Sequence, residues 1–230
     1  MEKKKYMEYL NWDNKTINDF SEKAVTDMYD RGYVFTRIGK GVMHQTRSVR
    51  IDLSKFELSS ENRRVIKKTE PLSIGISLLP LPVYGIEIGK IGSDFYSEKF
   101  GKGIMSAFKI KEMVTDPNKS NFNCLLRYTP PKAEEMFLGA AICYSNKEIL
   151  HYSYPFYDLK TSPKDMGLGM MIRSINFANE AGMKYIYLGS LQRPTDTYKL
   201  QFAGLEWFDG GPNGSQKWSS DLEEVKKILK

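Results

Sequence analysis

Two short runs of basic and neutral polar residues in the first third of the chain carry side chains that bind phosphates or carboxylates. Arginine contacts both oxygens of such an anion at once, and neighbouring hydroxyl or amide groups can complete the site. A strand, a loop and a helix could bring the two runs together, although a surface ion-pair network is the alternative. The runs are Arg47, Ser48 and Arg50, and then Asn62, Arg63 and Arg64.

A second group of reactive side chains follows a predicted strand near the C-terminus. This strand ends in Gly189 and Ser190, and a predicted helical turn with Tyr198 and Lys199 comes next. Ligands of α/β folds bind at the carboxyl ends of strands, and a tyrosine or lysine can assist proton transfer there. For Tyr187, which lies inside the strand, a place in the hydrophobic core is the alternative.

Side chains for the common catalytic centres are scarce. His44 and His151 are the only histidines, and Cys124 and Cys143 are the only cysteines. We therefore predict no metal site and no serine or cysteine triad. Acyl transfer to an amine needs little from side chains, since an α-amine has a pKa of about 8 and backbone donors can stabilise the oxyanion.

A glycine loop precedes a predicted helix over 166–181. In the segment KDMGLG at 164–169, Gly167 and Gly169 would let backbone N–H groups approach an anion at the positive end of the helix. Read from Lys164, the segment resembles the loop that binds the pyrophosphate of coenzyme A in GNAT acyltransferases. The alternative is that a tight turn needs the glycines.

The composition indicates a globular chain with a mildly basic surface. Of 230 residues, 41% are hydrophobic, and no run of about 18 apolar residues could span a membrane. The net charge is +6, and residues 31–68 alone carry +7, from ten basic and three acidic side chains. This excess permits a nucleic-acid partner, although a solvated surface is the alternative. With no signal-peptide pattern and no disulfide framework, we expect a reduced, cytoplasmic protein.

The spacing of hydrophobic residues predicts an α+β fold with helices packed on a mixed sheet. The tight turn at 145–147 predicts an antiparallel hairpin, and residues 70–92 are predicted to be loop or irregular strand. Strands are predicted over 33–38, 48–53, 122–128, 136–144, 148–157 and 184–188. Helices are predicted over 16–31, briefly from 59 or 60, and over 94–114, 166–181 and 221–229.

Seven short segments together resemble the arginyl-tRNA–protein transferases and their bacterial leucyl-transferring relatives. They are DRGY at 30–33, RSVRI at 47–51, LSSENRRV at 58–65, YPFYD at 154–158, MG at 166–167, YIYLG at 185–189, and Tyr198-Lys199 with Phe202. The resemblance implies transfer of an aminoacyl group from charged tRNA to the α-amine of proteins that begin with Asp, Glu or oxidised Cys. Arginine is the amino acid that we expect to be transferred. The product would enter an N-degron pathway.

The resemblance also implies a GNAT-like fold with a mostly antiparallel sheet, and roles for individual residues. It divides the chain into a basic region over 1–70, a connecting helical segment over 71–120 and a GNAT-like transferase domain over 121–230. The four arginines would bind tRNA phosphates or the acceptor's acidic side chain, and the donor ester would lie near Gly189 and Ser190. Aminoacyl-tRNA is the co-substrate, with no cofactor. Catalytic roles fall to Tyr187, Lys199 and Tyr198, and further binding positions are Ser48, Asn62, Tyr157, Asp158 and Gly167.

The chain departs from this family at two places. The cysteine cluster that usually precedes the RSVR-like segment is absent from 39–46, and the usual Arg-His-Gly of the middle helix is Lys99-Phe100-Gly101. No metal or iron–sulfur role is therefore carried over. Two alternatives to aminoacyl transfer stay open: an N-acyltransferase that uses acyl-coenzyme A at 164–169, and a catalytically silent module that binds acidic peptide N-termini or RNA.

Overall fold

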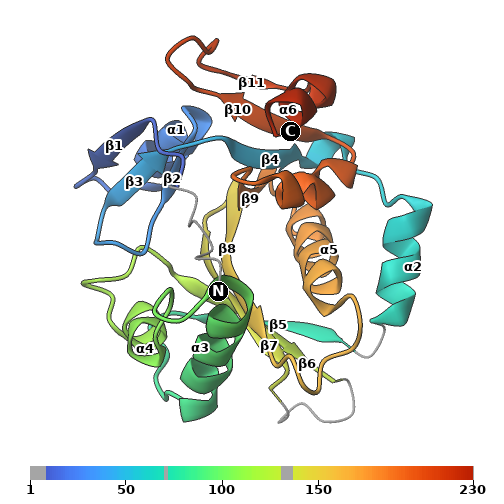
Figure 1. The fold of residues 1–230 in the computed structure, drawn as a ribbon. Coiled ribbons are helices and arrows are strands. Elements are labelled where there is room, and N and C mark those ends of the chain that lie inside the picture. The colour runs from blue at the N-terminus through green and yellow to red at the C-terminus, as the bar shows by residue number, and fades with distance from the viewer. Residues whose placement is uncertain (1–8, 70–71, 131–136, 230) are drawn as a thin grey trace, which may run out of the picture.

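Eight strands form the central sheet of the computed structural model, which describes residues 9–69, 72–130 and 137–229 (Figure 1). Their order is β11-β10-β4-β9-β8-β7-β6-β5, and every neighbouring pair is antiparallel except β8 and β9. The strands are β4 (Ser48–Asp52), β5 (Ser73–Leu78), β6 (Cys124–Thr129), β7 (Gly139–Ser145), β8 (Ile149–Tyr157), β9 (Tyr185–Ser190), β10 (Leu205–Asp209) and β11 (Lys217–Ser219). A smaller antiparallel sheet contains β1 (Asp13–Thr16), β3 (Val42–Gln45) and β2 (Tyr33–Phe35).

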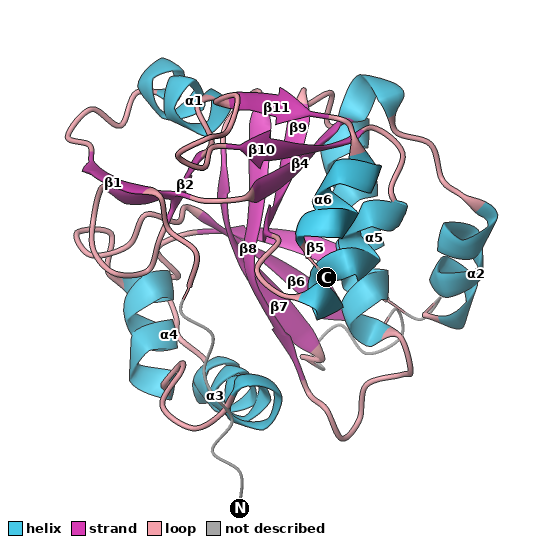
Figure 2. Cartoon of the chain, turned by 45° about the horizontal axis from the view of Figure 1, so that its top comes forward, coloured by secondary structure: helices cyan, strands magenta, loops and turns pink. Residues whose placement is uncertain are grey.

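Helices cover both faces of the large sheet, so the chain has two hydrophobic cores (Figure 2). One face packs against α2 (Ser60–Lys68), α5 (Met166–Glu180) and α6 (Leu222–Ile228). The other packs against α1 (Glu22–Asp30), α3 (Ile86–Phe100), α4 (Ala107–Thr115) and the small sheet. Two 3₁₀ helices, η1 (Leu53–Lys55) and η2 (Pro194–Gln201), lie in the connections. No helix in the described ranges is both long and apolar enough to cross a bilayer.

The predicted fold class, a mixed and mostly antiparallel sheet flanked by helices, is confirmed. The predicted hairpin is β7 with β8, which pair from Gly139 opposite Tyr157 to Ser145 opposite Leu150. All three predicted regions of the chain contribute strands to the same sheet. In particular β4, from the basic region, lies between β10 and β9 in its interior.

Three predicted elements differ from the structure. The helix predicted over 16–31 begins only at Glu22, because residues 13–16 pair with β3 and the Ser21 hydroxyl caps the first turn of α1. The helix predicted over 94–114 is two helices, since Gly101 and Gly103 adopt positive φ angles of 106° and 84°. Residues 70–92 contain β5 and the start of α3; β5 lies at the sheet edge and exposes most of its side chains, so its pattern is weak.

The parallel pair β8 and β9 separates after three residue pairs, which leaves a split in the sheet (Figure 1). The last pair is His151 with Tyr187; beyond it β8 follows β7 to Tyr157, while β9 follows β4 to Ser190. An irregularity in the β7–β8 register at Cys143 bends β8 at this point. Helix α5 connects the two strands, so its N-terminus lies at the same end of the sheet as the split.

Candidate active site

The C-terminal end of β9 forms one wall of the split. Gly189 has a φ of 77°, a left-handed conformation that favours glycine. Lys199 Nζ, on η2, donates a hydrogen bond of 2.8 Å to the carbonyl oxygen of Ser190. The Gln192 side-chain amide donates to the Ser190 hydroxyl and to the Thr46 hydroxyl, each at 2.8 Å. The structure thus brings together the predicted residues Gly189, Ser190 and Lys199.

Lys199 is a buried cation at this strand end. Its side chain is only 8% exposed, and burial lowers its pKa, an effect that the nearby Asp196 carboxylate opposes. A lysine in this state releases a proton more readily than an exposed lysine. The arrangement is suited to proton transfer at an ester or amine held beside Ser190.

Aromatic residues form the other walls. The Tyr157 ring, at the end of β8, packs 4.8 Å from the Phe95 ring of α3 and against the backbone of Gly167 in the first turn of α5. Tyr198, beside Lys199, is about half exposed, and burial of its hydroxyl end raises its pKa to about 12. The predicted residues Tyr157, Gly167 and Tyr198 therefore lie around the same split.

The N-terminus of α5 has backbone donors without acceptors. Its N-cap residue, Asp165, has a φ of 67° and provides no side-chain cap. Among the described residues, no acceptor lies within hydrogen-bond distance of the N–H groups of Gly167 and Leu168. Gly169 has another purpose, because a Cβ there would lie 2.5 Å from the Thr69 hydroxyl of α2. Only the first glycine of the predicted loop thus borders the anion-binding end of the helix.

Tyr152 is a residue of the split that the sequence did not single out. It follows His151, the last residue of β8 that pairs with β9, and is 2% exposed. Its hydroxyl has no hydrogen-bond partner in the part of the chain that the structure describes. Buried polar groups are nearly always paired, so this hydroxyl suits a bound ligand or water. The run YSYPFY at 152–157 reads as an ordinary core strand, and no sequence signal separates this tyrosine from its neighbours.

Several predicted site residues already have partners elsewhere. The Arg50 guanidinium forms ion pairs with Asp30 (2.9 Å) and Glu206 (2.8 Å) and lies between two aromatic rings. Tyr187 is fully buried, and its hydroxyl accepts a 3.4 Å hydrogen bond from Arg50. The Ser48 hydroxyl donates to a backbone carbonyl, 3.1 Å away, in the core. We therefore assign no chemical step to these three residues.

The remaining predicted positions lie beside the split or on the adjoining surface. Asn62 is buried and completes the capping box of α2. Arg64 pairs with Glu61 on the exposed side of α2, whereas Arg63 is exposed without an ion pair among the described residues. Arg47 is half buried beside Leu191, and burial lowers its pKa. Asp158 accepts hydrogen bonds from the turn after β8, which lower its pKa.

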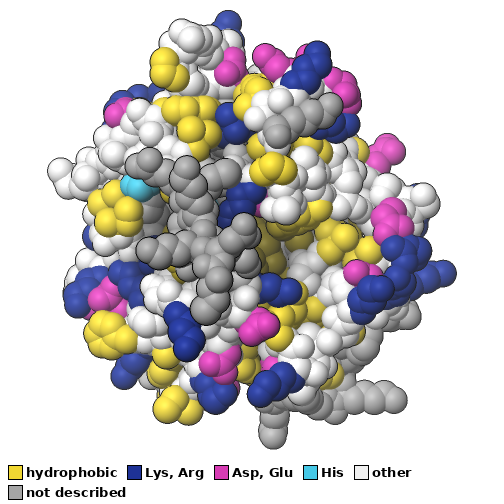
Figure 3. Space-filling view, in the orientation of Figure 1, with side chains coloured by type: hydrophobic (Ala, Val, Ile, Leu, Met, Phe, Trp, Pro, Cys, Tyr) yellow, Lys and Arg dark blue, Asp and Glu magenta, His cyan; other side chains and the backbone are white. Residues whose placement is uncertain are grey.

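The surface around the split combines an apolar hollow with basic side chains. In Figure 3 the middle of this face is hollowed between the positions of α3 and α5, and hydrophobic side chains form much of its floor. Lys and Arg side chains gather over α2 at the edge of the view. These are Arg63, Arg64, Lys67 and Lys68, all exposed, with Glu61 among them. Lys68 also pairs with Asp165 at 3.4 Å, which joins this basic surface to the N-terminus of α5.

Comparison with known proteins identifies similar bacterial transferases. An aspartate/glutamate leucyltransferase from Ruegeria pomeroyi is 26% identical over 167 residues, which cover 71% of this chain and 60% of that protein. The leucyltransferase of the same name from Dinoroseobacter shibae is 25% identical over 172 residues (71% and 60%). That from Alkalilimnicola ehrlichii is 26% identical over 182 residues (78% and 74%). The chain thus spans 60% of the length of two of these relatives, and no family model matches it.

Solved structures give weaker likenesses. L-PGS from Bacillus licheniformis has a TM-score of 0.45 at 14% identity, covering 74% of this chain and 52% of that one. The C-terminal domain of a putative lysylphosphatidylglycerol synthetase from Agrobacterium fabrum has a TM-score of 0.46 at 13% identity (78% and 54%). Both TM-scores are below 0.5, so no property of these two proteins is assigned to this chain. The resemblance seen in the sequence is thus supported in part: all three relatives named above are aspartate/glutamate leucyltransferases, and none of them is an arginyltransferase.

Proposed function

We propose that this chain transfers an aminoacyl group, leucine in preference to arginine, from charged tRNA to the N-terminal α-amine of proteins that begin with aspartate or glutamate. The relatives' names motivate the proposal. The observation that carries it is the split: a buried lysine and free backbone donors meet there, beside the basic surface of α2.

In this reaction the acceptor's amine nitrogen attacks the carbonyl carbon of the aminoacyl ester. A C–N bond forms and the C–O bond to the terminal ribose breaks; the nitrogen loses a proton and the ribose oxygen gains one. The ammonium of Lys199, whose pKa is lowered by burial, is suited to give that proton and to be recharged from the amine. The free N–H groups at the start of α5 are suited to the last phosphate of the tRNA, and the basic side chains of α2 to phosphates further along.

The charges around the split favour an apolar aminoacyl group over an arginyl one. An arginyl side chain requires a carboxylate partner. Three acidic side chains around the split are already engaged: Asp196 accepts from two backbone N–H groups of its own loop, Asp158 holds the turn after β8, and Asp165 pairs with Lys68. Aromatic rings of Tyr157 and Phe95 provide the apolar surface instead.

A transfer assay tests this proposal. The purified protein receives tRNA charged with labelled leucine or labelled arginine, together with peptides that begin with Asp, Glu or Ala. We expect leucine label on the Asp and Glu peptides, and little label from arginyl-tRNA or on the Ala peptide. Label from arginyl-tRNA alone would overturn the leucine preference, and no label from either donor would overturn the transfer activity.

A second candidate is N-acylation from acyl-coenzyme A. The N–H groups of Gly167 and Leu168, which have no hydrogen-bond partner among the described residues, could bind the pyrophosphate of coenzyme A as well as a tRNA phosphate. In both cases phosphate oxygens would accept from a helix N-terminus. Calorimetric titration with coenzyme A and with uncharged tRNA separates the two candidates. Binding of coenzyme A without binding of tRNA would favour the acyl-coenzyme A reaction.

A further inference from the structure

Arg37 lies over β8 beside the split, on the face opposite α2 and α5. It belongs to the connection between β2 and β3, and its backbone N–H donates a 3.1 Å hydrogen bond to the hydroxyl of Tyr154. Tyr154 lies three residues beyond His151, where β8 has already left β9. Its ring packs in the core under α3. No motif in the sequence distinguishes this arginine from the other basic residues of 31–68.

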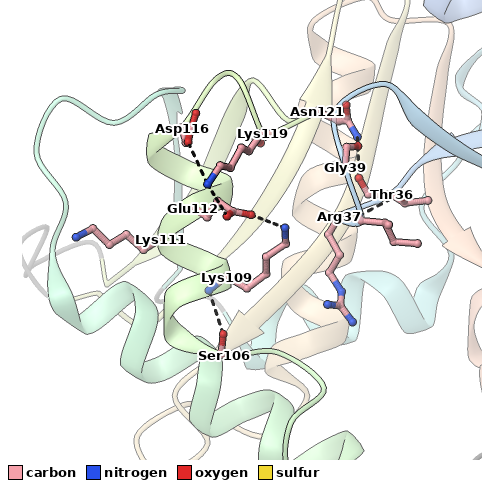
Figure 4. Close-up of polar contacts among 12 residues, drawn as sticks. Thr36, Arg37, Gly39, Ser106, Lys109, Lys111, Glu112, Asp116, Lys119 and Asn121 are labelled. Atoms are coloured by element: carbon pink, nitrogen blue, oxygen red, sulfur yellow. Dashed lines mark hydrogen bonds and ion pairs between the residues drawn. The ribbon is translucent and has the colours of Figure 1, made fainter. Parts of the chain in front are cut away.

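The guanidinium of Arg37 has no counter-ion among the described residues, although its side chain is half buried. The acidic residues drawn in Figure 4, Glu112 of α4 and Asp116 directly after it, pair with Lys109 and Lys119. In that view the Arg37 guanidinium points away from both carboxylates and no dashed line reaches it.

Two tyrosine hydroxyls lie within reach of the charge of this guanidinium. Its charge lowers the pKa of the phenols of Tyr154 and Tyr96, against the larger rise caused by their burial. The Tyr96 hydroxyl, on α3, donates to the Pro155 carbonyl at 3.2 Å and so lies at the same stretch of β8. The positive charge of Arg37 and these two hydroxyls therefore lie along the same stretch of β8.

Arg50 is a guanidinium with a structural role, and its surroundings differ from those of Arg37. There, two carboxylates and two rings surround the group. Removing an arginine from water without such a partner costs free energy. Leaving Arg37 half buried and unpaired is therefore explained if its partner comes from a ligand.

We infer that Arg37 binds the side-chain carboxylate of the acceptor's first residue. This inference rests on the proposed function, in which two substrates must meet at the split. The basic surface of α2 and the start of α5 lie on one face, so the acceptor enters from the other, where Arg37 lies. The carboxylate of Asp or Glu is one or two methylene groups from the α-carbon that bears the amine. A two-pronged contact with Arg37 would therefore hold the amine close to the split.

Direct peptide binding tests this inference without requiring transfer. Fluorescein-labelled peptides that begin with Asp or with the isosteric Asn are titrated with wild-type protein and with Arg37→Ala, Arg37→Lys and Arg31→Ala. Arg31 is the matched control: it is exposed, and among the described residues its guanidinium donates hydrogen bonds to the Asp27 carbonyl and the Met28 sulfur and makes no ion pair. We expect the wild type and Arg31→Ala to prefer Asp over Asn by about 10- to 100-fold. In Arg37→Ala this preference disappears through loss of Asp binding alone, and Arg37→Lys keeps part of it.

The outcomes separate the inference from the proposed function. If Arg37→Ala keeps the preference for Asp while the wild type transfers leucine, Arg37 is not the carboxylate-binding residue and the proposed function stands. If Asp binding depends on Arg37 and no transfer occurs, the inference stands and the function fails. No preference for Asp in the wild type overturns the inference. In the transfer assay, Arg37→Ala should raise KM for the Asp peptide by a similar factor and leave kcat unchanged, whereas a merely structural role would lower the thermal midpoint.

Discussion

The ammonium nitrogen of Lys199 lies 2.8 Å from the carbonyl oxygen of Ser190, so a buried cation marks the point where β9 ends beside the split. The two residues come from separate elements, since Ser190 ends the strand and Lys199 lies on the 3₁₀ helix that follows. The hydrogen bond between them fixes the height of the ammonium above the strand end. A donor ester placed against Gly189 would therefore meet a proton donor whose position does not depend on the ligand.

Replacing Lys199 with methionine should lower kcat for aminoacyl transfer by about 100-fold or more, because the leaving ribose oxygen loses its proton donor. KM for the peptide should change little. Single-turnover transfer measures the effect, and the thermal midpoint shows whether the variant is folded. Lys23→Met is the control, because Lys23 is exposed on α1 and its one ion pair within the described part of the chain is with Asp27. A folded Lys199→Met protein with kcat within about twofold of the wild type would exclude this role.

Replacing Arg63 with alanine should weaken tRNA binding and flatten its salt dependence. The slope of log K against log salt concentration should fall by about one, because one phosphate contact is lost. Arg63 is exposed and makes no ion pair among the described residues, so the variant should fold normally. Filter binding at several salt concentrations gives the slope. An unchanged slope would remove the phosphate-binding role of Arg63.

Replacing Arg50 with methionine should reduce the free energy of unfolding by about 3 kcal/mol, because Asp30 and Glu206 would lose their shared counter-ion. Arg64→Met should leave the free energy of unfolding nearly unchanged, since Arg64 and its partner Glu61 are both exposed to solvent. Urea unfolding at neutral pH measures both. If Arg50→Met were as stable as the wild type but bound tRNA poorly, Arg50 would be a ligand-binding residue as the sequence predicts.

The stability of the protein should fall below neutral pH because of His151. Burial lowers the pKa of this histidine from 6.5 to about 3, while Tyr29 holds its Nδ1 in a 2.8 Å hydrogen bond. Between these values the unfolded chain binds the proton and the folded chain does not, so acid favours unfolding. The free energy of unfolding should therefore fall by about 1.4 kcal/mol for each pH unit lost between pH 6 and pH 4.

His151→Gln removes this titration and is the comparison for the pH series. Its unfolding free energy should be lower than that of the wild type at pH 7 but should decline less between about pH 6 and pH 4. Urea titrations at each pH give the two curves. Parallel curves would show that His151 does not titrate as a neutral, buried group in the folded protein.

Much of the fold follows from local patterns in the sequence. The strands between Phe122 and Tyr157 are long and hydrophobic, and a short turn joins two of them, so the hairpin is predictable. Strands β1, β3 and β5 are not, because their side chains are largely exposed or mixed and their pairing is long-range, whereas β2 lies within the strand predicted over 33–38. The glycines that separate α3 from α4 appear in the sequence, but only their positive φ angles show that they end a helix.

The candidate site could be predicted only for residues that are close together in the sequence. Ser190 and Lys199 are nine residues apart, and their approach follows from a strand and the turn after it. Whether an arginine has an ion-pair partner cannot be predicted from its chain neighbours. Arg50 is neutralised by Glu206, 156 residues away, and Arg37 is placed by Tyr154, 117 residues away. A sequence shows that both are cations but not which of them has a partner.

The large sheet consists of two halves that are joined by the β8–β9 pairing. Strands β5 to β8 form one half and β9, β4, β10 and β11 form the other, and three residue pairs join them. A small rotation of one half relative to the other about these pairs would change the distance between Tyr157 and Ser190, which lie on opposite halves at the ends of their strands. The width of the opening therefore depends on the residue pairs at Ile149–His151, and a substitution that changes side-chain packing there would alter the separation of Tyr157 and Ser190 at the far end.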